Sequence, residues 1–259
     1  MGWENAKTLR QEANNWNNRM SVENTLATVK SIDESIIYEP TEFKTKDDTK
    51  IFVVQDVSQA AIFKTKLEGK MAVLNFASYK KPGGGYIDGA MAQEESLCHC
   101  SNLYQIISDD KFKTDFYEHN KKNLNNGLYD SRIIYSPDVV FYNKDKTKTK
   151  LCDVITSAAP NKTAIVKYNK NIDNYYIEQA MKDRILNILN VAMKNKVDIL
   201  ILGAFGCGVF GNDILSTARI FKECLTSYHY YRNMFKLVLF PIPDASTCNI
   251  FKEVMESNI

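Results

Sequence analysis

The chain has 259 residues, and its 33 Lys and Arg nearly balance 31 Asp and Glu, for a formal net charge of +2. This length suits one α/β domain with an extension. No basic stretch is interleaved with aromatic residues, so the composition argues against direct nucleic-acid binding. The longest apolar run, residues 199–205, is too short to cross a bilayer, and we expect no membrane association.

The amino terminus and the cysteines indicate a reducing compartment. Residues 1–5 hold no basic segment followed by an apolar stretch, so we expect no export signal. The six cysteines are scattered through a chain large enough to fold without disulfides. We therefore expect a cytoplasmic protein, with a nuclear location left open, and a monomer.

The first part of the chain reads as helical up to about residue 35. Apolar residues recur there near a 3.6-residue period at Trp3, Leu9, Ala13, Trp16 and Met20. Pro40 and the polar residues 45–48 then end the pattern. We interpret residues 1–45 as a helical extension packed on a catalytic domain of residues 46–259.

From residue 50 onward, short β-rich runs alternate with helical patterns. Strands are predicted at 51–54, 71–76, 139–142, 151–156, 199–202 and 237–240. Helices are predicted at 58–67, 93–107, 173–194 and 213–228. Buried strands flanked by helices predict a three-layer α/β/α sandwich.

A glycine triplet stands a short spacer ahead of a Gln and a pair of acids. The residues are Gly83, Gly84, Gly85, Gln93, Glu94 and Glu95. Glycines let backbone amides approach a ligand with no Cβ in the way, whereas adjacent acids opening a helix repel each other. The combination indicates a site that handles a glycoside. The structural alternative is that both acids only complement the helix dipole.

Glu94 and Glu95 are about 100° apart around a helix axis, so they cannot point at the same atom and their roles should differ. Cleavage at an anomeric carbon needs a proton on the leaving oxygen and then an activated water, and one carboxyl group can supply both in turn. The helix N-terminus favours ionised carboxylates, while the neighbouring acid and a bound diphosphate oppose ionisation. We expect substrate binding to secure the proton on the carboxyl group that acts as the general acid.

Two further segments follow predicted strands at the same edge of the sheet. Asn75 ends a strand, and ligands of open α/β sheets lie beyond the carboxyl ends of strands, so we expect Asn75 to bind a ribose hydroxyl. The alternative is a buried Asn that satisfies the loop backbone. Residues 159–161 are expected to form a wall of the site.

Residues 206–211 match the G-x-G-x-x-G pattern that is usually quoted for nicotinamide cofactors. That fingerprint wants an acidic residue about twenty positions on, which here falls among residues 228–232, where there is none. We therefore expect no cofactor. Successive amides beside a helix N-terminus still form a nest for a diphosphate.

No metal is expected. Cys98, His99 and Cys100 diverge around a helix and cannot converge on one ion; we expect Cys100 in the core and His99 exposed. Adenine recognition is the least determined part. Asp56, Phe240 and Phe251 are candidates, although single aromatic residues at strand ends are usually core.

Together these motifs resemble the catalytic signature of microbial poly(ADP-ribose) glycohydrolases, a macrodomain family marked by Gly-Gly-Gly, a spacer of six to eight residues, and Gln-Glu-Glu. The spacer here is residues 86–92. The resemblance continues through residues 73–78, 96–97, 103–104, 135–137, 159–161 and 202–212. It implies a three-layer α/β/α macrodomain with a mixed central sheet.

The resemblance also implies an activity: hydrolysis of the ribose–ribose O-glycosidic bonds of poly(ADP-ribose) to release ADP-ribose. It implies that Glu95 is the general acid/base, that Glu94 holds ribose hydroxyls, and that the glycine triplet wraps the distal ribose. Asn75 and Gln93 belong to the implied ligand-binding set. The implied diphosphate loop consists of Gly206, Cys207, Gly208, Val209 and Phe210, with Phe210 near the distal ribose.

The expected partners are ADP-ribose and either poly(ADP-ribose) or an ADP-ribosylated protein. We expect chains to be trimmed from the free end, with a stall at the protein-linked unit near Tyr86 and Phe210. Two alternatives stay open: a mono-ADP-ribosyl-protein hydrolase, and a non-catalytic ADP-ribose-binding macrodomain. The paired acids favour an enzyme, because a binding module gains nothing from acids that face an anionic ligand.

Overall fold

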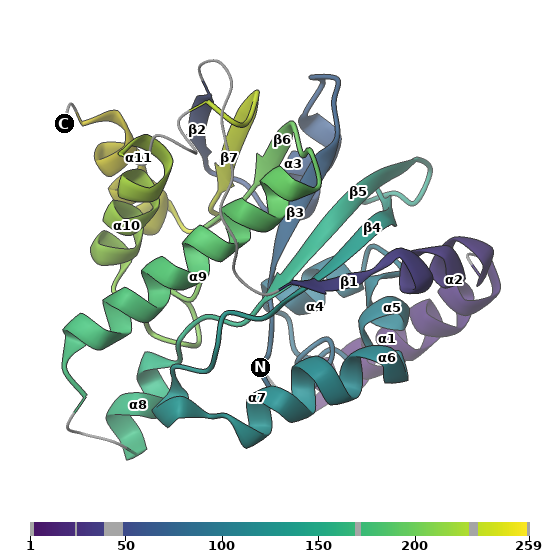
Figure 1. Cartoon of the computed structure of the whole chain (residues 1–259). Coiled ribbons are helices and arrows are strands. Elements are labelled where there is room, and N and C mark those ends of the chain that lie inside the picture. The colour runs from purple at the N-terminus through teal and green to yellow at the C-terminus, as the bar shows by residue number, and fades with distance from the viewer. Residues whose placement is uncertain (1–2, 24, 39–48, 169–171, 228–232, 258–259) are drawn as a thin grey trace.

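The computed structural model describes residues 3–23, 25–38, 49–168, 172–227 and 233–257. A seven-stranded sheet, in the order β1-β4-β5-β3-β6-β7-β2, forms its middle layer (Figure 1). The five strands from β5 to β2 run parallel, and β4 runs antiparallel to both of its neighbours. The strands are β1 (Ile36–Tyr38), β2 (Lys50–Val54), β3 (Met71–Phe76), β4 (Ile133–Tyr142), β5 (Thr149–Ser157), β6 (Ile199–Ile201) and β7 (Leu237–Pro241).

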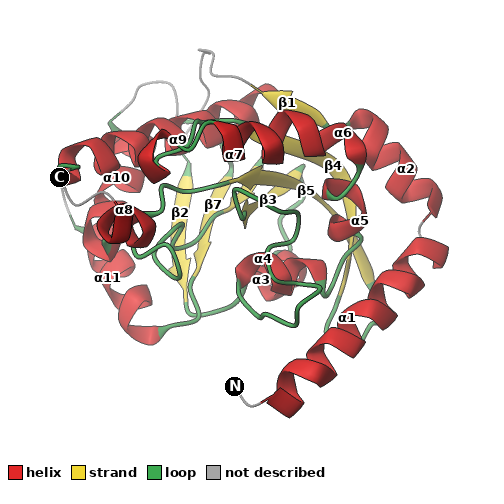
Figure 2. Ribbon diagram, turned by 90° about the horizontal axis from the view of Figure 1, so that it is seen from below, coloured by secondary structure: helices red, strands yellow, loops and turns green. Residues whose placement is uncertain are grey.

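Helices cover both faces of this sheet (Figure 2). One core cluster joins the sheet to α9 and α10, and a second joins it to α1, α3, α4 and α5. The expected three-layer α/β/α sandwich with a mixed sheet is therefore confirmed. The helices are α1 (Trp3–Glu23), α2 (Thr25–Glu34), α3 (Ser58–Lys64), α4 (Gln93–Cys98), α5 (Leu103–Ile107), α6 (Asp110–Phe112), η1 (Lys113–Glu118), α7 (His119–Lys122), η2 (Asn125–Gly127), α8 (Lys162–Tyr168), α9 (Asn174–Lys194), α10 (Ile214–Thr226) and α11 (Ala245–Glu256).

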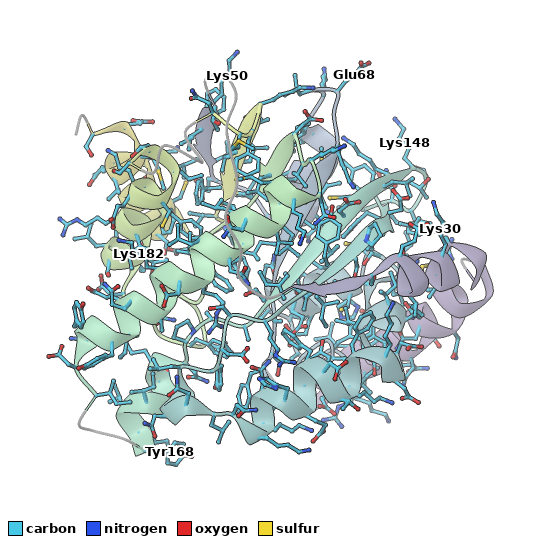
Figure 3. All side chains as sticks on the ribbon, in the orientation of Figure 1. Lys30, Lys50, Glu68, Lys148, Tyr168 and Lys182 are labelled. Carbon is cyan, nitrogen blue, oxygen red and sulfur yellow. The ribbon has the colours of Figure 1, made fainter. Side chains whose placement is uncertain are left out.

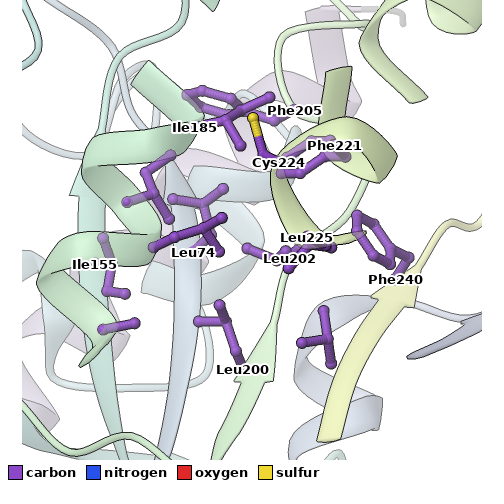
Figure 4. Packing of buried hydrophobic residues seen from close by; sticks show 14 of the residues in the cluster. Leu74, Ile155, Ile185, Leu200, Leu202, Phe205, Phe221, Cys224, Leu225 and Phe240 are labelled. Atoms are coloured by element: carbon purple, nitrogen blue, oxygen red, sulfur yellow. The ribbon is translucent and has the colours of Figure 1, made fainter. Parts of the chain in front are cut away.

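Strand β3 lies in the middle of the sheet and is apolar on both faces. Successive strand residues point to opposite faces, so Ala72 and Leu74 join the cluster under α9 and α10, while Met71 and Val73 join the opposite one. Leu74 packs there among side chains of β5, β6 and α10 (Figure 4). Burial on both faces explains why a central strand reads as a continuous hydrophobic run.

The N-terminal segment is part of both the sheet and the core. Ala13, Trp16 and Met20 on α1 are buried in the second core cluster, and the indole Nε1 of Trp16 donates to Ser101 O at 3.1 Å. Residues 36–38, which fall inside the predicted helical extension, form strand β1 and pair with β4. The boundary at residue 45 falls in 39–48, outside the described residues, and remains a prediction.

Several elements differ from their predicted form. Strand β4 begins six residues before the predicted 139, with a register shift between Ser136 and Val139. The predicted helix 93–107 is split into α4 and α5, because Ser101 leaves the helix to bridge Phe141. Helices α8 and α11 were not predicted.

The parallel strands run downward in the view of Figures 1 and 3, so their carboxyl ends point toward the side of the molecule where α7 and α8 lie. Lys50, the first residue of β2, and Glu68, just before β3, lie at the upper edge, whereas Tyr168 at the end of α8 lies at the lower edge (Figure 3). The glycine triplet, α4 and the 206–211 loop all follow carboxyl ends. Among the described residues, no helix is both long and apolar enough to cross a membrane.

Candidate active site

Glu95 is fixed in place by backbone amides on both sides of its carboxyl group. Its Oε1 accepts a hydrogen bond from Gly85 N at 2.7 Å, and its Oε2 accepts one from Ala92 N at 3.0 Å. The second bond is one half of a capping box at the start of α4; the other half is missing because Ala92 has no side-chain oxygen. Glu95 is only 6% exposed, so its position is set by the fold.

Glu94 is held by a different set of donors. Its Oε2 accepts from Ser78 N at 2.8 Å, and its Oε1 accepts from Asn75 Nδ2 at 3.2 Å. Burial raises the pKa of Glu94 from 4.5 to about 8 against the lowering effect of these hydrogen bonds, and the nearby Glu95 adds to the rise. Glu94 is therefore mostly protonated at neutral pH, which relieves the repulsion between the two acids.

Asn75 lies fully buried at the end of β3. Its Nδ2 also lies 3.3 Å from Thr156 Oγ1, and its Oδ1 has no hydrogen-bond partner among the described residues. Its contacts are with side chains rather than with the loop backbone. Asn75 therefore orients Glu94, and its contact with a ribose hydroxyl stays a prediction.

The glycine triplet packs directly against the two acids. A Cβ on Gly84 would lie 2.6 Å from Glu95 Oε1 and 3.0 Å from Glu94 Oε2. Gly84 also has φ +57°, in the left-handed region. The loop packs so closely on the carboxyl groups that only glycine fits at position 84, with or without a bound ligand. Gly83 has φ +65°, and a Cβ on Gly85 would lie 2.6 Å from Ala90 Cβ.

Gln93 joins the start of α4 to neighbouring elements. Its Oε1 accepts from Phe76 N at 2.9 Å, and its Nε2 donates to Leu74 O at 2.8 Å and to Ser58 Oγ at 3.2 Å. The side chain also lines the cavity described below. These bonds support a positioning role for Gln93, and its predicted contact with the ligand is not tested by them.

The structure corrects two expectations near the glycine triplet. Tyr86 is fully buried, and its hydroxyl lies 3.1 Å from both Ala13 O and Asn17 Oδ1 of α1, so it cannot face a leaving group. His99 is only partly exposed, because its ring packs edge-on against Tyr86 at a centroid distance of 4.7 Å. Both rings fix the outer side of the glycine loop to α1.

A cavity of about 510 Å³ opens next to the start of α4, and neither acid is among its lining residues. Its floor includes Phe76 and Phe205, whose rings meet edge-on at 5.5 Å. Ala92 and Gln93 border it at the start of α4, and residues 241–244 border it after β7. The lining is mainly apolar, which suits a planar base.

The 206–211 loop forms another wall of this cavity. Gly206, Cys207, Gly208, Val209 and Phe210 all line it, as expected for a diphosphate loop, and Val209 is 79% exposed. No neighbouring atom lies within 4 Å of a Cβ placed on Gly208, and Gly208 does not have positive φ. Burial raises the pKa of the Cys207 thiol to about 11, so this thiol stays protonated and is a poor nucleophile.

Asn212 anchors that loop, a role the sequence did not reveal. Its Nδ2 donates to Pro160 O at 2.8 Å and to Gly206 O at 2.9 Å. Gly206 has φ +73°, and a Cβ there would lie 2.6 Å from the same nitrogen. Thr163 N donates to Phe210 O at 3.0 Å, so α8 holds the far end of the loop.

The start of α11 also borders the cavity and was missed. Asp244 caps this helix by accepting from Thr247 N at 2.8 Å, and both residues line the cavity. An acidic cap before a helical apolar pattern was the available sequence signal. The adenine candidates fare differently: Phe240 and Phe251 are fully buried core residues, and Asp56 is paired with Lys64 at 2.6 Å.

Within the described residues, no group of three or more His, Cys, Asp or Glu could hold a metal ion. What the site does offer is a pair of buried carboxyl groups, a glycine loop bonded to one of them, and an apolar cavity walled by a second glycine-containing loop. On a three-layer α/β/α sandwich, these features define a glycosidase-type site for a nucleotide-bearing ligand.

Comparison with protein families identifies the family. The model of the microbial-type PARG catalytic domain matches residues 6–144, which is more than half of the chain. The chain belongs to this family of poly(ADP-ribose) glycohydrolases, as its motifs predicted. The matched region includes most of α1 as well as both acids, and it ends before the 206–211 loop.

Solved structures extend the likeness to nearly the whole chain. The poly(ADP-ribose) glycohydrolase of Thermomonospora curvata superposes with a TM-score of 0.84 at 25% identity, covering 97% of this chain and 99% of that chain. The same enzyme bound to the inhibitor ADP-HPD gives a TM-score of 0.82 at 25% identity, covering 96% and 99%. The Deinococcus radiodurans enzyme in complex with ADP-ribose gives 0.80 at 28%, covering 88% and 97%. A comparison with curated proteins gave no match.

Proposed function

We propose that this family member hydrolyses the ribose–ribose O-glycosidic bonds of poly(ADP-ribose), with Glu95 as the general acid/base. One observation carries the assignment to Glu95: its carboxyl group is held at 2.7 Å and 3.0 Å by two backbone amides, in the turn of α4 that borders the cavity through Ala92 and Gln93. A carboxyl group held by two backbone amides keeps its orientation toward the scissile bond during the reaction. Glu94 is held deeper, and we assign it the ribose hydroxyls.

Hydrolysis needs one proton transfer from Glu95 to the leaving oxygen and one from water back to Glu95. Glu95 donates its proton to the oxygen that joins two ADP-ribose units, and the bond from that oxygen to the anomeric carbon breaks through an oxocarbenium-like state. Water then adds to the anomeric carbon and returns a proton to Glu95. The products are free ADP-ribose and a chain shortened by one unit, whose ribose regains a hydroxyl group.

The cavity suits the rest of the ADP-ribose molecule. We place the diphosphate against the backbone of residues 206–210, where the Cβ-free Gly208 leaves an open approach. The base then lies over the apolar floor of Phe76 and Phe205. The complex of the Deinococcus radiodurans relative with ADP-ribose supports this choice of ligand.

We further propose that chains are trimmed from the free end, with a stall at the protein-linked unit. Because Tyr86 is buried, the discrimination against a protein side chain cannot come from it, and Phe210 at the cavity wall is the remaining predicted contact. A mono-ADP-ribosyl-protein hydrolase is the other outcome, which product analysis separates.

The test uses Glu95→Gln, which keeps the shape of the side chain but removes the mobile proton. We expect ADP-ribose affinity within about twofold of wild type and turnover of poly(ADP-ribose) lowered by ~10²–10⁴-fold. More than a tenth of wild-type turnover would contradict the assignment. A time course on an automodified acceptor then tests the mode: early long free oligomers contradict end-trimming, and removal of the last protein-linked unit contradicts the stall.

We also propose that the protein acts in the cytoplasm as a monomer. All six cysteines are free thiols, which suits a reducing compartment. Fractionation of the native cells with a thiol-trapping reagent tests this, because disulfide-bonded protein would contradict it.

A further inference from the structure

An aromatic pair close to the acids in the chain fold does not line the cavity. The rings of Tyr79 and Tyr129 stack at a centroid distance of 4.3 Å and an interplanar angle of 18°. Tyr79 directly follows Ser78, whose backbone amide donates to Glu94 Oε2 at 2.8 Å. The pair therefore belongs to the surroundings of the reacting bond.

Neither tyrosine is among the residues that line the cavity. The cavity is bordered by segments that follow β3, β6 and β7, whereas Tyr129 hydrogen-bonds Asn161, which follows β5 on the other side of β3. The connection after β5 runs between the two regions, since Ala159 lines the cavity. The tyrosine pair is therefore linked to Glu94 through Ser78 and to the connection after β5 through Asn161, and it does not line the cavity.

The tyrosine pair is rigid on one side and open on the other. Tyr129 is 5% exposed and has φ +58°, an unusual backbone for an aromatic residue that persists only where surrounding contacts impose it. Asn161 N donates to Gly127 O at 2.9 Å and fixes the same loop. Tyr79 is partly exposed, because Tyr129 covers one face of its ring. The exposed Lys80 follows it.

The structure of poly(ADP-ribose) indicates which part of the substrate would contact Tyr79. The oxygen released in the reaction is a hydroxyl of the adenosine ribose of the next unit, and the adenine is attached to the adjacent carbon of that ribose. The leaving adenine therefore remains within a few ångströms of the bond that is cut. Resting on the proposed function, we infer that Tyr79, backed by Tyr129, is a stacking platform for the adenine of the leaving unit, with Lys80 near its diphosphate.

Binding in the Glu95→Gln background tests the platform, because a two-unit chain is not cut there. We expect the two-unit chain to bind tighter than ADP-ribose by about 5- to 100-fold, the range for one base stacked on an aromatic ring. Tyr79→Ala should remove this advantage and leave the Kd for ADP-ribose unchanged, whereas Tyr79→Phe should keep it.

The controls separate a platform from a packing role. If Tyr79→Ala lowers the melting temperature, Tyr79→Leu retains apolar packing on Tyr129 but offers no aromatic face, and it should still lose the advantage of the two-unit chain. Equal binding of one and two units by the parent, or an advantage that survives in Tyr79→Leu, would overturn the inference. Failure to bind ADP-ribose at all would instead count against the proposed function.

Discussion

Gly84 and Gly208, one in each glycine-containing loop of the site, are glycine for different reasons. Gly84 has φ +57° and leaves no room for a Cβ, because the carboxyl groups of Glu94 and Glu95 already fill that space. Gly208 has neither positive φ nor any neighbour within 4 Å of its would-be Cβ. The first glycine is required by the folded protein, and the second is required only when something occupies the cavity.

This difference separates preorganisation from binding. The glycine triplet carries an amide to Glu95 and so sets the position of this proposed catalytic group before any ligand arrives. The 206–211 loop is fixed at its ends by Asn212 and Thr163, and its middle is left open toward the cavity. Substitutions in the first loop should therefore damage turnover and folding, and substitutions at Gly208 should damage affinity alone.

The largest effect is expected for Gly84→Ala. The added methyl group would overlap Glu95 Oε1, and alanine resists the left-handed backbone at a cost of about 1 kcal/mol. We expect turnover to fall by at least ~10²-fold, the scale for a catalytic group displaced by about 1 Å, together with a lower melting temperature. Gly208→Ala is the matched control and should leave the melting temperature unchanged; equal damage from both would refute the distinction.

Glu94, which packs against the glycine triplet, should make the free energy of unfolding depend on pH. Its pKa is raised from 4.5 to about 8 in the folded state, so between these values the folded state binds more protons than the unfolded state. The free energy of unfolding therefore falls as pH rises through this window, by on the order of a few kcal/mol. Denaturant unfolding at pH 5, 7 and 9 measures the change.

The variant Glu94→Gln isolates this contribution. An amide at position 94 accepts from Ser78 and donates to Asn75 if the Asn75 amide is turned over, which also gives a partner to the unsatisfied Oδ1. We expect the variant to lose most of the fall in stability between pH 5 and 9. An unchanged slope would mean that Glu94 is ionised in the folded protein at neutral pH.

A smaller and purely binding effect is expected for Gly208→Val. Its side chain meets no protein atom at Cβ, so the folded state should tolerate it, but it narrows the approach of a diphosphate to the backbone amides. We expect ADP-ribose affinity to fall by ~1–3 kcal/mol, the cost of hydrogen bonds left unmade, with no loss of melting temperature. If calorimetry shows that Gly208→Val binds ADP-ribose like wild type, the proposal that this loop binds the diphosphate is wrong.

The sequence was a better guide to which segments lie close together than to what each residue contacts. Spacing along the chain singled out the glycine triplet, both acids and residues 206–210. The structure packs the triplet against the acids and lines the cavity with residues 206–210, and their functional roles stay predictions. Asn212, Ser78 and the start of α11 were missed, because their roles depend on contacts between segments distant in sequence. Tyr86 was misassigned because the docking of α1 against the glycine loop carries no local signal.

The smallest effect concerns that docking. The hydroxyl of Tyr86 lies 3.1 Å from Ala13 O and from Asn17 Oδ1, and the Arg10 Nε donates to Asp88 O at 3.0 Å. These contacts tie α1 to the outer side of the glycine triplet, so α1 acts on catalysis only through the loop. Tyr86→Phe removes the hydroxyl and keeps the ring, which should cost ~0.5–1.5 kcal/mol of stability.

Turnover in Tyr86→Phe should fall only a few-fold, because the ring still packs against His99 and Tyr104 and the amide of Gly85 keeps its bond to Glu95. ADP-ribose affinity should not change, since the cavity and the 206–211 loop lie elsewhere. Parallel measurement of turnover and affinity checks this. A loss of affinity larger than the loss of turnover would show that α1 supports the binding loop too, and the two loops could then no longer be treated as separate parts of the site.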